Sequence, residues 1–337
     1  MLDLNHKTLL VTGGTGSFGH SFIQTVLERF PKVKRIIIYS RDEHKQFEMA
    51  LRFHHPALEY RIGDVRDLSR LKRACEGVDI LIHSAAIKHV STAELNPFEC
   101  IKTNILGAEN IIEAALDCGI KQVVALSSDK ATAPINLYGA TKLCADKLFV
   151  AAQNITGNRE LTFSVVRYGN VLGSRGSVVP IFLEQRKKGK LPVTHREMTR
   201  FINTPMEGVE LVLFAIETAW GGEIFVPKIP AFRVIDLAEA IAPSCPIEVV
   251  GIRPGEKLHE EMLTEMDSLN TLEFDRYFIL TPPMPRWSVE ERMQAGNGKT
   301  VPMGFRYHSN QPETWLSVNE LREQIKIHVD PDFQPAL

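Results

Sequence analysis

Short apolar runs alternate with longer segments of helical periodicity through the first half of the chain. The apolar runs that we expect as strands are residues 8–13, 35–40, 59–64, 79–85 and 121–128. Near-continuous apolar runs of this kind are typical of parallel strands covered on both faces. Helical stripes lie between them, formed by Phe18, Phe22, Val26 and Phe30 and by Ile105, Ala108, Ile112 and Ala115. This order predicts an α/β fold with a doubly wound parallel sheet.

The pattern changes in the second half of the chain. A helix at about 136–155 and a strand at 163–170 extend the same sheet, and shorter strands, helices and turns follow them. We therefore predict a larger domain at 1–172 and a smaller C-terminal lobe at 173–337, partly interlaced with the first.

Charge and composition narrow the class of protein. The 39 basic and 41 acidic residues give a net charge of -2, which excludes a strong attraction to nucleic acid or to anionic membranes. The five cysteines are scattered without a C-x-x-C pair, at positions 75, 100, 118, 144 and 245. With no signal-peptide pattern in "MLDLNHKTLLVTGG" and no apolar run long enough for a membrane span, we expect a cytoplasmic protein with reduced cysteines.

The first strand runs into "TGGTGSFGH", which opens a helix. Gly13, Gly16 and Gly19 are spaced G-x-x-G-x-x-G, and Thr15, Ser17 and Phe18 lie within the turn. Glycines allow a tight turn and a close approach to a pyrophosphate, which the helix N-terminus attracts. A merely flexible turn is the alternative. The place of the motif, directly after the first strand, favours a dinucleotide site.

The end of the second strand indicates which dinucleotide binds. The segment is "YSRDEHK", in which Ser40, Arg41, Asp42, Glu43 and Lys45 are candidate contacts. An acidic residue usually ends this strand where NAD binds, whereas here it is an arginine, with a lysine one helical turn further on. Two cations suit a 2′-phosphate, so NADP is favoured over NAD, with solvated surface charge as the alternative.

Two further segments complete the cofactor site. Asp64 and Val65, after the third strand, are expected where an adenine would lie. Ala85, Ala86 and Lys88 follow the fourth strand and are expected beside the cofactor, although the lysine could be plain surface.

The stretch "LSSDKATAPINLYGATK" carries the candidate chemistry. Asp129 and Lys130 end the fifth strand, so they fall at the edge of the sheet where ligands of such folds bind. Tyr138 and Lys142 are four residues apart and share one helix face. An adjacent ammonium and the charge of an oxidised nicotinamide would favour the phenolate, which can take a proton from an alcohol. Alone this spacing arises by chance, but it is specific after a dinucleotide fold.

These motifs together resemble the extended short-chain dehydrogenase/reductase superfamily. Within it, the chain resembles the inverting UDP-N-acetylglucosamine 4,6-dehydratases, which start the route to pseudaminic acid on flagellin and bacterial surface glycans. The segments that carry the resemblance are "TGGTGSFG", "YSRDEHKQ", "IGDVRD", "AAIKHV", "KTNILGAEN", "PINLYGATK", "RYGNVLGSRGSVVP", "MTRF" and "GIRPGEKLHE". The usual sugar-nucleotide 4,6-dehydratases carry Asp-Glu where this chain has Asp129-Lys130. A related capsule-type branch lacks the tyrosine that Tyr138 supplies.

The resemblance implies a role for each catalytic candidate. Tyr138, supported by Lys142, takes the C4 hydroxyl proton as hydride leaves for NADP. Lys130, its pKa lowered by Lys142 and the cofactor, removes the acidified C5 hydrogen, and a protonated Asp129 releases the C6 hydroxyl as water. Ser128 hydrogen-bonds the substrate or Tyr138, with a mere cap of the loop as the alternative. The implied product is UDP-2-acetamido-2,6-dideoxy-β-L-arabino-hex-4-ulose.

The resemblance also implies where the nucleotide sugar binds. The candidate substrate contacts are Lys88, Asn170, Ser174, Arg175, Gly176, Ser177, Thr194, Arg200, Arg253 and Glu256. Each alone is more often solvated surface than a ligand contact. The histidines at 83, 89 and 259 lack metal-ligand spacing, so no metal is expected.

Two other functions stay open at this point. A retaining dehydratase or an epimerase acting on another nucleotide sugar would share everything except the role of Lys130. A non-catalytic dinucleotide-binding regulator would be expected to lack Tyr138 or Lys142. The resemblance further implies a homo-oligomer, either a dimer or a hexamer.

Overall fold

The computed structural model describes residues 2–174 and 176–336, and its largest element is a ten-stranded sheet. Its strands are β1 (Thr8–Thr12), β2 (Arg35–Ser40), β3 (Leu58–Ile62), β4 (Ile80–His83), β5 (Gln122–Ser128), β6 (Thr162–Tyr168), β10 (Ile224–Pro227), β14 (Thr271–Glu273), β15 (Tyr277–Leu280) and β16 (Lys299–Thr300). The order across the sheet is β16-β14-β15-β10-β6-β5-β4-β1-β2-β3. The strands from β3 to β10 are parallel, and β15, β14 and β16 pair antiparallel at the other edge. The predicted doubly wound α/β fold is confirmed.

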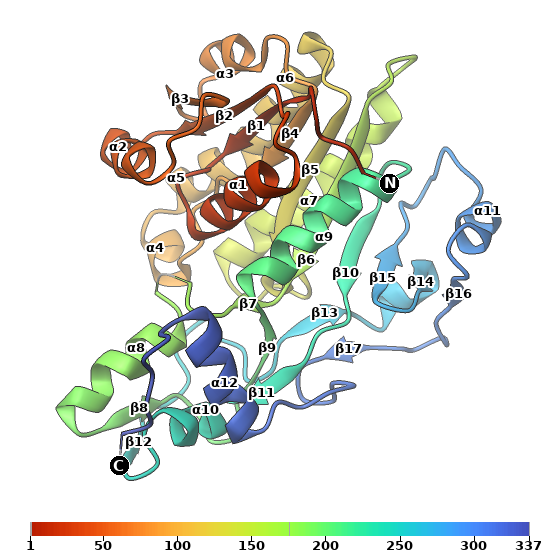
Figure 1. The fold of residues 1–337 in the computed structure, drawn as a ribbon. Helices are drawn as coiled ribbons and strands as arrows, with labels where there is room; N and C mark the ends of the chain where they lie inside the picture. The colour runs from red at the N-terminus through yellow and green to blue at the C-terminus, as the bar shows by residue number, and fades with distance from the viewer. Residues whose placement is uncertain (1, 175, 337) are drawn as a thin grey trace.

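Helices cover both faces of this sheet (Figure 1). They are α1 (Ser17–Arg29), α2 (Glu43–Arg52), α3 (Leu68–Cys75), α6 (Gly107–Cys118), α7 (Leu137–Ala152) and α9 (Pro205–Thr218). Apolar side chains of α1, α2 and α9 pack in one core layer, and those of α3, α6 and α7 pack in the other. Short helices α4 (Val90–Leu95), α5 (Pro97–Ile101) and α11 (Val289–Gln294) lie in the connections.

Burial along the strands follows from their place in the sheet. β1 lies between two strands and is buried along its whole length, as its apolar run predicts. β3 is an edge strand, and its residues are only partly buried, with Ile62 50% exposed. Glu59 and Arg61 within β3 fit this place, because an edge strand leaves part of its side chains in solvent.

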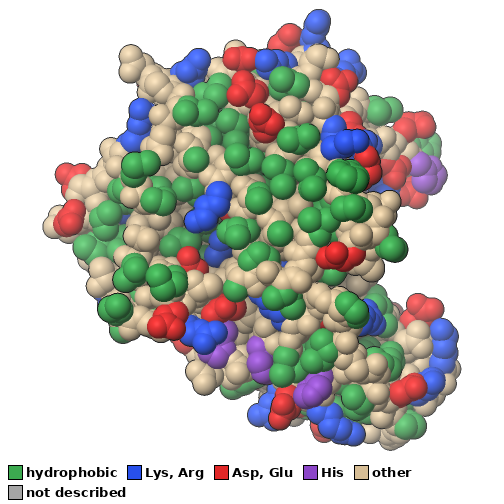
Figure 2. Space-filling model, turned by 180° about the vertical axis from the view of Figure 1, so that it is seen from behind, with side chains coloured by type: hydrophobic (Ala, Val, Ile, Leu, Met, Phe, Trp, Pro, Cys, Tyr) green, Lys and Arg blue, Asp and Glu red, His purple; other side chains and the backbone are tan. Residues whose placement is uncertain are grey.

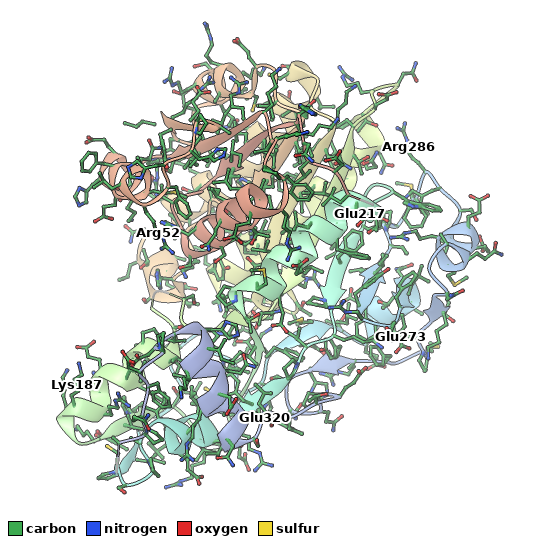
Figure 3. The ribbon with its side chains drawn as sticks, in the orientation of Figure 1. Arg52, Lys187, Glu217, Glu273, Arg286 and Glu320 are labelled. Atoms are coloured by element: carbon green, nitrogen blue, oxygen red, sulfur yellow. The ribbon has the colours of Figure 1, made fainter. Side chains whose placement is uncertain are left out.

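A smaller lobe hangs below the large sheet in Figure 1. Its elements are β7 (Asn170–Val171), α8 (Val178–Gln185), β8 (Leu191–Val193), β9 (Thr199–Asn203), β11 (Ala231–Arg233), α10 (Val234–Ile241), β12 (Ile247–Val249), β13 (Glu261–Leu263), β17 (Tyr307–His308) and α12 (Val318–His328). They form small sheets β11-β9-β7, β12-β8 and β13-β17, and a separate apolar cluster joins α8, α10 and α12. Figure 3 places Lys187 and Glu320 on this lobe, and Arg52 and Glu217 on the large domain.

The two halves of the chain are interlaced. β10, β14, β15 and β16 come from the second half but complete the large sheet. Figure 3 labels Glu273 on β14. Its carboxylate is 2.7 Å from the ammonium of Lys228, which follows β10. The boundary at residue 172 remains a prediction. The chain crosses back into the large sheet after it, through β10, β14, β15 and β16.

The outer surface matches the near-neutral composition. Figure 2 shows acidic and basic side chains interspersed over the face opposite that of Figure 1, and a notch between the large body and the lobe. Within the described residues, no helix combines the length and the apolar character that crossing a bilayer requires.

Candidate active site

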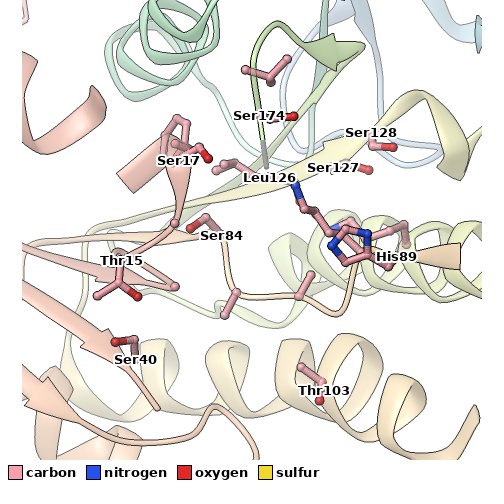
Figure 4. A pocket seen from close by; sticks show the side chains of 18 of the residues that line it. Thr15, Ser17, Ser40, Ser84, His89, Thr103, Leu126, Ser127, Ser128 and Ser174 are labelled. Carbon is pink, nitrogen blue, oxygen red and sulfur yellow. The ribbon is translucent and has the colours of Figure 1, made fainter. Parts of the chain in front are cut away.

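A cavity of about 620 Å³ lies at the carboxyl ends of the parallel strands, where the lobe meets the large sheet. Figure 4 shows Thr15, Ser40 and Ser84 on its large-domain side, Ser127 and Ser128 at the end of β5, and Ser174 from the lobe connection. The predicted residues that line it are Gly13, Thr15, Gly16, Ser17, Phe18, Ser40, Arg41, Asp42, Lys45, Asp64, Val65, Ala85, Ala86, Lys88, Ser128, Asp129, Lys130, Tyr138, Lys142, Asn170, Ser174, Gly176 and Ser177. Gly19, Glu43, Thr194, Arg200, Arg253 and Glu256 do not line it, and Arg175 lies outside the described residues.

The glycine turn is close-packed as well as flexible. Gly13 has a φ of +65°, and a Cβ there would lie 2.9 Å from the Ala85 backbone. A Cβ on Gly19 would lie 2.0 Å from the carbonyl oxygen of Gly14, so α1 can approach β1 only with glycine at this position. The N-cap, Gly16, provides no side-chain hydrogen bond, which leaves the first amides of α1 for a ligand.

The end of β2 carries two cations that are paired with acids. The Arg41 guanidinium is 3.7 Å from the Asp64 carboxylate, and the Lys45 ammonium is 2.9 Å from Asp42. Asp42 also caps α2 by accepting from the backbone amide of Lys45. Arg41 remains 56% exposed, so its guanidinium can still bind a phosphate at the cavity rim.

The Asp129-Lys130 pair is joined by direct hydrogen bonds. Lys130 Nζ donates to Asp129 Oδ1 over 3.0 Å. Ser128 Oγ donates to the same oxygen over 3.0 Å and accepts from the Lys130 amide over 3.1 Å. The other carboxylate oxygen, Asp129 Oδ2, is buried without a hydrogen-bond partner among the described residues. The chain turns here in a short 3-10 segment, Asp129–Ala131, which brings the two side chains together.

The electrostatics of this pair differ from the expectation. Burial raises the pKa of Asp129 more than the Lys130 ammonium lowers it, so this carboxyl is easier to protonate than an exposed one, as its predicted role requires. Burial alone would lower the pKa of Lys130, but the carboxylates of Asp129 and Glu260 outweigh it and raise that pKa. The expected lowering of the Lys130 pKa is therefore wrong for this structure, because two acids, and not Lys142, surround the ammonium.

Tyr138 and Lys142 lie on α7 and face the cavity. Lys142 Nζ donates to the Leu126 carbonyl over 2.5 Å, and burial lowers the pKa of the ammonium. Burial also raises the pKa of Tyr138, although the Lys130 ammonium and a hydrogen bond with Ser128 act in the opposite direction. The structure therefore does not favour the phenolate as the spacing predicted, and the cation that assists it is Lys130.

Several polar atoms buried in the cavity wall make no hydrogen bond to the described residues. Ser127 Oγ, Asn170 Oδ1 and Ser177 Oγ have no hydrogen-bond partner within the described part of the chain. Because buried polar atoms are almost always hydrogen-bonded, this pattern indicates a polar ligand. Ser177 is also the N-cap of α8, where no side-chain cap occupies the helix terminus. This arrangement fits the predicted polar loop at a helix start.

The predicted substrate residues further into the lobe lie apart from this wall. Arg200 is buried, and it donates to the carbonyls of Thr199, Lys257 and Leu258. Its guanidinium also lies 3.6 Å from the carboxylate of Glu256. Arg253 is exposed, and Thr194 is half-buried beyond the cavity. The roles of these residues as nucleotide contacts remain predictions.

Sequence reasoning missed three residues that the structure brings to this region. Glu260 lies 3.4 Å from the Lys130 ammonium, Tyr168 lines the cavity beside Tyr138, and Thr12 Oγ1 is 2.9 Å from His83 Nδ1. The only signal for Glu260 was its place after "RPGEKLH", which does not reveal that it faces the catalytic pair. Among the described residues, no group of three or more His, Cys, Asp or Glu side chains could hold a metal ion.

The fold and cavity can be compared with known proteins. The chain is 51% identical over 327 residues to the UDP-N-acetylglucosamine 4,6-dehydratase (inverting) of Campylobacter jejuni, covering 95% of this chain and 98% of that protein. It is 41% identical over 279 residues to a UDP-glucose 4-epimerase of Rickettsia canadensis, covering 81% and 82%. The solved structure of Pen from Bacillus thuringiensis matches with a TM-score of 0.88 at 38% identity, covering 96% of this chain and 98% of that one. Because the model of the family described as polysaccharide biosynthesis protein matches residues 9–282, the chain belongs to that family.

Proposed function

We propose that this protein is an inverting UDP-N-acetylglucosamine 4,6-dehydratase. The observation that carries the proposal is the hydrogen-bonded Asp129-Lys130 pair in the cavity that Tyr138 and Lys142 also line. The 51% identity to a relative named for this activity supports it along 95% of the chain. The product is a 4-keto-6-deoxy sugar inverted at C5, which suits the first step of pseudaminic acid synthesis.

NADP is the proposed cofactor. The uncapped N-terminus of α1, the close glycine turn and the exposed cation Arg41 fit a dinucleotide with a 2′-phosphate. When bound, NADP would supply the hydride acceptor for C4 and the hydride donor for C6. Tyr138 takes the C4 hydroxyl proton while Lys130 is still an ammonium, whose charge favours the phenolate, and Lys142 is held on the same helix by the Leu126 carbonyl.

The Asp129-Lys130 contact supplies both an acid and a base. Lys130 is an ammonium in this structure, so it has to lose a proton before it can act as a base. Transfer of that proton along the 3.0 Å hydrogen bond to Asp129 makes Lys130 neutral and protonates Asp129 in one step. Lys130 then takes the C5 hydrogen, the C6–O bond breaks, and Asp129 gives its proton to the departing oxygen, which leaves as water. Both residues end the elimination in their starting charge states.

An epimerase is the second candidate, favoured by the similarity to the Rickettsia protein. Epimerisation at C4 needs Tyr138 but no acid and base for C5 and C6. Asp129 is 1% exposed and its Oδ2 lacks a partner within the described chain, so burying it would serve no purpose in an epimerase. This difference makes the two candidates distinguishable.

NMR of the reaction in heavy water tests the proposal. The protein is incubated with NADP and UDP-N-acetylglucosamine, and a dehydratase loses the C6 oxygen, forms a C4 ketone and incorporates deuterium at C5. Inversion appears as the coupling pattern of an L-arabino ring. A product that keeps its C6 hydroxyl and inverts only C4 would establish the epimerase instead.

A further inference from the structure

Glu260 is a buried acid that the proposed chemistry does not use. It immediately precedes β13, and its side chain is almost fully buried. Its Oε1 atom lies 3.4 Å from Lys130 Nζ and 3.7 Å from Arg200 Nε. Its Oε2 atom has no hydrogen-bond partner within the described part of the chain. Burying a carboxylate costs free energy unless cations pair with it, and one of the two cations that pair with Glu260 is Lys130.

Two hydrogen bonds with Ser309, a residue near the end of the chain, hold the backbone of Glu260. Its amide donates to Ser309 Oγ over 2.9 Å, and its carbonyl accepts from the Ser309 amide over 2.8 Å. Ser309 is fully buried and follows β17, the strand that pairs with β13. The carboxylate therefore reaches the catalytic pair from a rigid element of the lobe.

Other charged and titratable groups surround the pair. Asp129 comes from the end of β5, Tyr138 from α7 and Arg200 from β9, and each contributes to the electrostatics of Lys130 or is influenced by it. Lys257 donates to the Thr132 carbonyl over 2.6 Å and lies near enough to act on Glu260. Lys130, Arg200 and Lys257 together outweigh burial and lower the pKa of Glu260, so Glu260 stays ionised while Asp129 is the acid that takes up a proton.

We propose that Glu260 is a positioning residue for the elimination: its carboxylate holds the Lys130 ammonium beside Asp129 and sets the pH range in which the Asp129-Lys130 pair holds the single proton that the elimination needs. This role rests on the proposed dehydratase function. Glu260 touches neither the sugar nor the cofactor in this account and exchanges no proton. The two acids thus have different roles. Asp129 takes up and releases a proton, while Glu260 stays an anion and keeps Lys130 in place when Asp129 is protonated.

The test compares E260Q and E260D with E261Q. Glu261 is the next residue, and its carboxylate pairs with Arg306 over 3.0 Å, so E261Q removes a charge from the adjacent position and leaves the Lys130-Glu260 contact in place. Deuterium incorporation at C5 and loss of the C6 hydroxyl are followed by NMR across pH, using UDP-N-acetylglucosamine and NADP. The affinity for UDP-N-acetylglucosamine is measured separately by calorimetry.

The expected sign follows from charge. The pair eliminates only while its two side chains share one proton, so the acid limb of the elimination profile marks the uptake of a second proton by Asp129 beside the Lys130 ammonium. Glu260 raises the pKa of both groups, so E260Q moves this limb down by about one to three pH units. We expect a maximal elimination rate about tenfold below wild type, or lower, because the ammonium loses a fixed partner, and unchanged substrate affinity. E260D keeps the charge at a greater distance, so its limb lies between those of wild type and E260Q. E261Q matches wild type.

Three outcomes would overturn the role. A slower E260Q enzyme whose acid limb stays at the wild-type pH would mean that Glu260 only supports the fold. A wild-type rate and limb in E260D, where E260Q does not fold, would exclude a distance-dependent action on Lys130. If wild-type protein itself neither incorporates deuterium at C5 nor loses the C6 hydroxyl, the proposed function fails, which the wild-type control reveals before any variant is compared.

Discussion

Lys130 Nζ donates a 3.0 Å hydrogen bond to Asp129 Oδ1, while the second oxygen of that buried carboxylate has no partner among the described residues. This contact predicts the behaviour of Lys130→Met. Without the base, deuterium incorporation at C5 should fall at least about 100-fold. The C4 oxidation does not need Lys130 as a base, so it should continue, more slowly because the Lys130 charge no longer favours the Tyr138 phenolate. Reduced nicotinamide should then accumulate and be visible by its near-ultraviolet absorbance.

Lys147→Met is the matched control for this variant. Lys147 is on α7 like Tyr138, the proposed proton acceptor, but its side chain is exposed. It should retain wild-type turnover and NADP affinity. Elimination at the wild-type rate in Lys130→Met would refute the assignment of Lys130 as the base.

Asp129→Asn should separate the acid from the base. Asparagine keeps the shape of Asp129 but cannot receive the Lys130 proton or deliver it to the C6 oxygen. We expect release of the C6 hydroxyl to slow by about 100-fold or more, with NADP affinity retained. NMR of the C6 position measures the effect, and a variant that still forms the 6-deoxy product at the wild-type rate would contradict the role.

Arg41→Ala should change the preference between the two dinucleotides. A guanidinium bonded to a 2′-phosphate contributes about 1.5–3 kcal/mol, so NADP affinity should fall by about 10- to 150-fold. NAD lacks that phosphate, and its affinity should change little. Titration of both dinucleotides measures the difference, with Arg52→Ala, at the far end of α2, as the control. An equal loss for both cofactors would show that Arg41 does not read the phosphate.

Two glycines on different helices should respond in opposite ways to alanine. At Gly19 the new Cβ would lie 2.0 Å from the Gly14 carbonyl oxygen, so α1 must move and the free energy of unfolding should fall by about 3 kcal/mol. At Gly208, inside α9, a Cβ meets no atom within 4 Å. There alanine should stabilise by about 0.5–1 kcal/mol through its helix propensity. Chemical denaturation measures both, and a neutral Gly19→Ala would contradict the close packing.

His83 should make stability depend on pH. Its ring is buried at the end of β4, and burial, with a smaller effect of Lys142, lowers its pKa from 6.5 to about 3. Below pH 6.5 the unfolded chain therefore binds a proton at His83 that the folded protein does not bind. The free energy of unfolding falls progressively as the pH drops from 6.5 toward 3. Between about pH 7 and about pH 5 the loss attributable to His83 is about 2 kcal/mol.

Denaturation of His83→Gln at the same two pH values is the comparison. Glutamine can still bond Thr12, which lies 2.9 Å from the histidine ring, but it does not titrate. The variant should lose about 2 kcal/mol less than wild type on acidification. Parallel curves for the two proteins would mean that His83 is protonated in the folded state.

Local patterns accounted for most of the large sheet. The run 35–40 coincides with β2, and 121–128 differs from β5 by one residue, because each central strand must be apolar on both faces. The return of β10 and of β14–β16 to the same sheet was not predicted beyond a general interlacing. Short strands of two to four residues carry too little periodicity to reveal a partner far away in the chain.

The sequence by itself determined the glycine turn, the shared helix face of Tyr138 and Lys142, and the adjacency of Asp129 and Lys130, because neighbours in the chain or within one helical turn are held by covalent geometry. Only the tertiary structure decided how these groups ionise. Glu260 reaches Lys130 from the lobe and raises its pKa, while burial raises that of Tyr138. Ionisation depends on desolvation and on charges a few ångströms away, and those neighbours come from segments that the fold alone brings together.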